Sequence, residues 1–223
     1  MKSYWIGILL LSLPPYLESD VDKALGFLHQ QSPLIERVVP AADFPTAEIL
    51  SVVAPELIRY GWLRDFMETQ ALEIAYLNFG SSGADFSIGP FQMKPSFVEK
   101  MEAYADAHPD VQDRIPFPII STASTEKAKR HQRLARLRDP EWQLRYALAF
   151  YHIGTHRFGF LQSLSPPERL AFLATAYNYG FDRPVAEIKD WQATEAFPYG
   201  RKFRGAQASY ASVALAIYRG LEH

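Results

Sequence analysis

Apolar residues recur at three- and four-residue spacing along most of this 223-residue chain, and few runs alternate strictly between apolar and polar residues. This spacing is typical of amphipathic helices, because a helical turn contains 3.6 residues, whereas alternation would indicate strands. Helix starts are expected at Thr46, at Asp139-Pro140 and at Ser165-Pro166, and Pro55 should interrupt the helix that begins at Thr46. The pattern therefore predicts a mostly α protein.

One stretch departs from helical spacing. Residues 84–92 alternate enough to predict a short β-hairpin or an extended segment beside the helices. A further helix should follow from Ser96, because Ser96 and Glu99 have capping-box spacing. With 48% hydrophobic residues the chain can bury one substantial core, so we expect residues 20–223 to form a single domain.

The first 19 residues have two interpretations. The apolar run at positions 5–13 follows Met1-Lys2, is too short to span a bilayer as a helix and has the length of a signal-peptide core. It is either a signal peptide, which predicts export to the periplasm or cell envelope, or a buried N-terminal helix ended by Pro14-Pro15. The other segments are too polar to cross a membrane, so at most peripheral membrane association is expected.

Composition excludes several kinds of chemistry. The chain has no cysteine, which excludes thiolate nucleophiles, disulfides and cysteine-based zinc sites. His152 and His156 lie one helical turn apart, but the glutamate of a zinc protease and a third ligand are missing, so neither a metal nor an organic cofactor is predicted.

A block at positions 127–138 holds six Lys or Arg residues. We interpret it as a solvated helix face rather than a nucleic-acid site, since the net charge is -2 and the block lacks aromatic residues for base stacking. A basic-patch nucleic-acid binder is the remaining reading, and it predicts salt-sensitive retention of DNA or RNA.

Two short motifs, far apart in the chain, carry the functional signal. They are Gly89-Pro90-Phe91-Gln92 and Ala176-Tyr177-Asn178-Tyr179-Gly180. In this order they resemble the Gly-Leu-Met-Gln and Ala-Tyr-Asn-Ala-Gly motifs of the lysozyme-like lytic transglycosylases, a goose-type lysozyme-like family. The resemblance covers roughly residues 46–219, and the chain departs from it at Pro90-Phe91 and at Tyr179.

This resemblance implies a lysozyme-like domain that cleaves the β-1,4 bond between N-acetylmuramic acid and N-acetylglucosamine in peptidoglycan. In such enzymes one glutamic acid protonates the glycosidic oxygen and then acts as base while the substrate's 6-hydroxyl closes an anhydro ring. A second carboxylate is not needed, unlike in most glycosidases. The acid needs a largely apolar site that raises its pKa towards the working pH.

Three glutamates are candidates for this acid. Glu56 follows the apolar run at positions 49–54 that precedes the family's catalytic glutamate, and we take it as the candidate. Glu73 fits better by distance, because it lies 16 residues before Gly89 (89 minus 73) whereas Glu56 lies 33 before it (89 minus 56). Glu68 is the third. Neither Glu56 nor Glu73 precedes the serine that the family has at the next position.

The resemblance also implies substrate-binding residues. They are Ser87, Gly89, Gln92, Tyr177, Asn178 and Tyr210. The family's tyrosine orients the acid, a role that falls to Tyr177 here, while the alternative is that Tyr177 and Tyr210 are core residues and Asn178 is a helix cap. The expected partner is the glycan strand of peptidoglycan, and the pattern indicates no oligomeric state. The rival function is a non-catalytic glycan-binding or envelope-assembly protein, which the missing serine favours.

Overall fold

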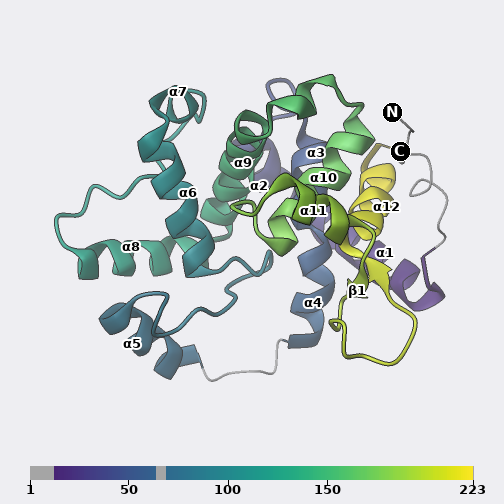
Figure 1. The fold of residues 1–223 in the computed structure, drawn as a ribbon, viewed down its shortest axis with the longest axis horizontal. Helices are drawn as coiled ribbons and strands as arrows, with labels where there is room; N and C mark the ends of the chain where they lie inside the picture. Colours follow the sequence, from purple (N-terminus) through teal and green to yellow (C-terminus); the bar gives the residue numbers. More distant parts are fainter. Residues whose placement is uncertain (1–12, 64–68, 223) are drawn as a thin grey trace.

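The computed structural model describes residues 13–63 and 69–222 and is mostly α-helical with one short antiparallel hairpin, as predicted (Figure 1). The helices of the first half are α1 (Pro15–Gln30), α2 (Ser32–Val38), α3 (Thr46–Val53), α4 (Pro55–Leu63), α5 (Thr69–Phe79), α6 (Pro95–Ala107) and α7 (Pro109–Gln112). Those of the second half are α8 (Glu126–Arg138), α9 (Pro140–Arg157), the 3-10 helix η2 (Gly159–Ser163), α10 (Pro166–Tyr179), α11 (Val185–Gln192) and α12 (Tyr210–Glu222).

Helix α9 lies between two groups of helices. On one side α3, α10 and α12 pack against one another, with α1 and α4 beside them, and on the other side α6 packs against α9 and α8 (Figure 1). Tyr146, Phe150 and Ile153 of α9 are fully buried, as are Phe172 of α10 and Ile217 of α12. Burial of such large apolar side chains is the main stabilising contribution in a domain of this size.

Several helix starts that the sequence predicted are observed in the structure. The carboxylate of Asp139 accepts a hydrogen bond from the Glu141 amide (2.9 Å), and Ser165 with Glu168 forms a capping box at the start of α10. Helix α3 ends at Val53 and α4 begins at Pro55, because proline offers no amide to continue the helical ladder. The predicted boundary between residues 19 and 20 falls inside α1, and residues 1–12 lie outside the described residues.

The paired strands lie elsewhere than expected. Residues 84–92 form no strand, and Ile88 and Met93 make an isolated bridge instead. Gly89 and Gln92 both have positive φ angles (69° and 50°), so the chain turns back before a ladder can extend. The hairpin consists of β1 (Glu195–Phe197) and β2 (Ala208–Ser209), which pair antiparallel.

The capping box predicted at Ser96 is also wrong. The amide and hydroxyl of Ser96 both donate to the carboxylate of Asp85 (3.1 and 2.8 Å). Glu99 instead accepts hydrogen bonds from the hydroxyls of Tyr76 and Ser81. The Asp85 carboxylate, eleven residues upstream, therefore provides the hydrogen-bond acceptor for the first turn of α6 in place of a local capping box.

The basic block forms α8, and its predicted solvated face is contradicted in part. Arg133 and Arg136 are each only 8% exposed. Arg133 forms two hydrogen bonds with Glu102 of α6 (2.9 and 2.7 Å), and Arg136 donates to the Ile119 carbonyl (2.6 Å). Their long side chains reach acceptors on neighbouring segments, so these cations hold the fold together rather than face a partner.

None of the helices in the described ranges is both long and apolar enough to span a bilayer.

Candidate active site

A small pocket brings together side chains from three distant parts of the chain. Its volume is about 110 Å³, and it is lined by Glu56, Arg59, Ser87, Gln92, Met93, Lys94, Phe97, Tyr177 and Asn178. Helix α4, the turn before α6, the first turns of α6 and the end of α10 each contribute part of the wall. Five predicted site residues meet here, namely Glu56, Ser87, Gln92, Tyr177 and Asn178.

Glu56 lies in the first turn of α4 and is 4% exposed. Among the described residues its Oε2 atom has no hydrogen-bond partner, while Oε1 lies 3.5 Å from Nη1 of Arg59. Burial raises the pKa of the Glu56 carboxyl, and the Arg59 guanidinium and the side chains of Asn178 and Tyr210 oppose this rise. The net effect is a raised pKa, so the Glu56 carboxyl keeps its proton to a higher pH than an ordinary glutamate does. This suits a proton donor.

The turn that carries Gln92 is fixed by its own hydrogen bonds. Ile88 and Met93 exchange two backbone hydrogen bonds (2.9 and 3.1 Å), and the Gln92 side-chain amide donates to the Gly89 carbonyl (2.8 Å). Gly89 itself does not line the pocket. A Cβ atom at Gly89 would lie 1.8 Å from Nε2 of Gln143, so the glycine permits close approach of Gln143 rather than of a ligand.

Gln143 was missed by the sequence reasoning. It lies in α9, is fully buried, and donates from Nε2 to the carbonyls of Ile88 (2.8 Å) and Leu137 (2.6 Å). Its Oε1 atom accepts from the Phe91 amide (3.0 Å). The available signal was an uncharged polar residue within the apolar stripe of a helix, because a buried amide needs partners. Gln143 anchors the turn to the central helix.

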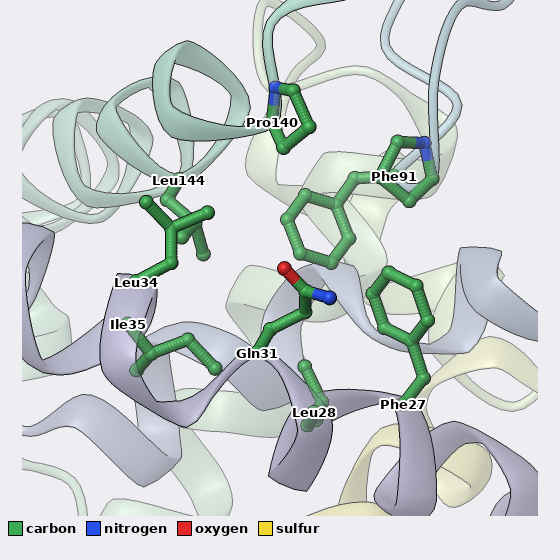
Figure 2. Close-up of a pocket in the computed structure, with 9 residues that line it drawn as sticks. Phe27, Leu28, Gln31, Leu34, Ile35, Phe91, Pro140 and Leu144 are labelled. Carbon is green, nitrogen blue, oxygen red and sulfur yellow. The ribbon is translucent and has the colours of Figure 1, made fainter.

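The reverse side of the turn packs into the core. Phe91 is 3% exposed, and with Pro90 it lines an apolar pocket against α1, α2 and α9. Figure 2 shows the Phe91 ring between Phe27, from α1, and Leu144, from α9. Pro90 and Phe91 therefore provide packing, while the next residue, Gln92, lines the pocket that holds Glu56.

The two predicted tyrosines have different positions. The hydroxyl of Tyr177 donates to the Phe91 carbonyl (2.7 Å), so it links the two motifs, and Tyr177 lines the pocket together with Glu56. Tyr210 is 3% exposed, donates to the Val52 carbonyl (3.3 Å) and does not line the pocket. Tyr210 thus matches the alternative of a core tyrosine behind the acid.

One of the two rival acids, Glu73, does not line this pocket. The Glu73 carboxylate forms an ion pair with Arg138 of α8, and Glu73 is not among the residues that line the pocket. Glu68 lies outside the described residues. Of the glutamates that can be compared, Glu56 is therefore the one that shares a pocket with Gln92 and Asn178.

The two histidines of α9 have separate surroundings. The Nδ1 atom of His156 is hydrogen-bonded to the Tyr104 hydroxyl (2.9 Å), and its Nε2 atom lies 3.2 Å from the Asp110 carboxylate. His152 is more buried, and this burial lowers the pKa of its imidazole. In the part of the chain that the structure describes, no group of three or more His, Cys, Asp or Glu side chains is arranged to hold a metal ion.

Comparison of the chain with protein-family models, with curated proteins and with solved structures finds no match.

Proposed function

We propose that this protein cleaves the β-1,4 bond between N-acetylmuramic acid and N-acetylglucosamine in peptidoglycan, as a divergent lysozyme-like lytic transglycosylase with Glu56 as acid and base. The supporting observation is that a buried carboxyl with a raised pKa shares one pocket with Gln92 and Asn178, which come from the two motifs. The substrate is a cell-wall polymer, so we also propose that the protein is exported.

Two steps account for the reaction. The protonated Oε2 of Glu56, which is unpaired among the described residues, donates its proton to the glycosidic oxygen as the bond to C1 breaks. The 6-hydroxyl of the same sugar then attacks C1, and its proton passes to the Glu56 carboxylate, which restores the acid. Water is not consumed, and the product carries a 1,6-anhydro ring.

Arg59 stabilises the ionised form of the Glu56 carboxyl. Its guanidinium lowers the pKa of the Glu56 carboxyl, so it stabilises the carboxylate that forms after the proton is donated. Its Nε atom donates to the Pro198 carbonyl (3.1 Å), which fixes the guanidinium beside the acid. Glu56 is the one carboxylate among the described residues that line this pocket, and the proposed single-glutamate mechanism needs no second one.

Digestion of purified sacculi tests this proposal. Wild type should release muropeptides with anhydro ends, and Glu56→Gln should release none, because the amide keeps the shape of the side chain but donates no acidic proton. Glu73→Gln is the matched control and should retain activity. Unchanged release by Glu56→Gln would remove Glu56 from the mechanism, and products with reducing ends would indicate hydrolysis instead.

A second function is supported by one observation. Arg59 lies close enough to Glu56 to favour the ionised carboxylate, which works against proton donation. If the carboxyl is ionised at the working pH, the pocket is a glycan-binding site without turnover. Retention of wild type on sacculi with no release of soluble products would select this alternative.

A further inference from the structure

A basic loop joins β1 to β2. Within residues 198–207 the side chains of Arg201, Lys202 and Arg204 are exposed. The sequence has no Asp or Glu between Glu195 and Glu222. None of the ion pairs formed within the described ranges includes these three cations. The loop therefore presents three exposed cations that form no ion pair with the carboxylates of the described residues.

The same loop carries two exposed aromatic rings. Tyr199 is 41% exposed and Phe203 is 44% exposed, and their rings stack with centroids 4.2 Å apart. Aromatic faces of this kind pack against the apolar faces of sugar rings, and the adjacent cations attract carboxylates. We refer to residues 198–207 as the basic-aromatic loop.

Two contacts fix this loop beside the pocket that holds Glu56. At one end the Pro198 carbonyl accepts a hydrogen bond from Arg59, a residue of the pocket wall. Further along, the Arg201 guanidinium lies 4.3 Å from the centre of the Trp191 ring. The Trp191 ring stacks on the Tyr179 ring with centroids 4.4 Å apart, and Tyr179 directly follows Asn178, one of the two residues that α10 contributes to the pocket. Figure 1 shows the loop next to the lower end of α4.

The pocket can hold only part of a saccharide. Its volume of about 110 Å³ is well below the roughly 300–1,000 Å³ of typical small-molecule sites. A glycan strand cleaved at Glu56 must therefore continue over the neighbouring surface. The basic-aromatic loop adjoins the pocket wall at Arg59.

We infer that the basic-aromatic loop binds the carboxylates of the glycan strand, so that the protein selects anionic strands over neutral chains of the same sugar backbone. This inference rests on the proposed function, because it places the strand at Glu56. Peptidoglycan carries carboxylates from two sources, the lactyl group of N-acetylmuramic acid and the stem peptide. A lipid surface would also attract cations, but the contacts to Arg59 and Trp191 put this loop beside the acid.

Equilibrium binding tests the inference, in the Glu56→Gln background so that strands stay intact. The test variant adds Lys202→Gln and Arg204→Gln, which leaves the Arg201–Trp191 contact in place. The control adds Lys127→Gln and Lys129→Gln on α8, which changes the net charge equally away from the pocket. The probes are peptide-bearing strands, strands stripped of peptides by an amidase, and neutral chito-oligosaccharides.

Each exposed ion pair contributes a factor of about two in affinity, so the test variant should bind anionic strands roughly fourfold more weakly, with a smaller dependence on salt. Its affinity for chito-oligosaccharides and the affinities of the control should be unchanged. A loss on stripped strands assigns the lactyl carboxylate, and a loss confined to peptide-bearing strands assigns the stem peptide.

Three results would overturn the inference. The first is equal affinity of the test variant and the control for anionic strands. The second is a loss of affinity for neutral chito-oligosaccharides as large as the loss for anionic strands. The third is unchanged strand binding together with lost retention on phosphatidylglycerol vesicles, which would assign the loop to lipid. Failure of the proposed function is distinguishable, because it appears as tight strand binding by the loop without any cleavage by the wild-type protein.

Discussion

Substitution of Gly89 by alanine should destabilise the protein strongly. The φ angle of 69° lies in the left-handed region, where a Cβ costs about 1–2 kcal/mol. The new Cβ would also lie 1.8 Å from Nε2 of Gln143 and displace that side chain. Gln143 makes three buried hydrogen bonds, and at about 1 kcal/mol each their loss adds about 3 kcal/mol. The expected loss is about 4–5 kcal/mol in the free energy of unfolding.

Urea denaturation measures this loss, with Gly26→Ala as control. Gly26 lies inside α1, and a methyl group at this position would meet no other atom within 4 Å, so alanine there should stabilise by about 0.5–1 kcal/mol. In a Gln143→Ala background the obstacle is gone, and Gly89→Ala should then cost only about 1–2 kcal/mol, which is the backbone strain alone. Additive costs in the double variant, or a cost below about 1 kcal/mol for Gly89→Ala alone, would refute the reasoning.

Three further predictions concern charge and hydrogen bonding. Because burial raises the pKa of Glu56 above its ordinary 4.5, the folded state binds its proton more tightly than the unfolded state, so this contribution to stability is lost as the pH rises through the window from 4.5 to the raised pKa. The difference in Tm between Glu56→Gln and wild type should therefore grow with pH across that window, and a constant difference would argue against a buried carboxyl. Arg59→Gln should move the basic limb of the pH–rate profile on sacculi to higher pH, since Arg59 lowers the pKa of Glu56, and a shift to lower pH would contradict this role. Arg133→Gln leaves the Glu102 carboxylate buried without its cation and should lower the free energy of unfolding in urea by about 3–5 kcal/mol. Lys129→Gln removes one partner of an exposed ion pair and should lower it by less than about 1 kcal/mol. Equal losses would show that the burial of Arg133 contributes little.

The sequence predicted those elements whose signals are local. Asp139-Pro140 and the Ser165 box specify a helix start through contacts within a few residues, and both starts are observed. Strand β2 has two residues, so no alternating pattern could reveal it. The buried arginines of α8 were misread for a related reason, because their partners lie on α6 and in the segment before α8.

The candidate site was predicted in part. Glu56 was chosen from the apolar run before it, although its distance to Gly89 favoured Glu73, and the structure puts Glu56 beside Gln92. The distance along the chain was a poor guide to this pocket because α5 separates Glu56 from the turn in sequence, while the fold brings the two together. Gln143 escaped notice because its function depends on backbone groups more than fifty residues away, which helical spacing cannot report.

The burial of Glu56 depends on segments that are synthesised well after it. In the unfolded chain its carboxyl is surrounded by water, has an ordinary pKa and is ionised at neutral pH. The raised pKa of the Glu56 carboxyl therefore arises only once the tertiary structure is complete.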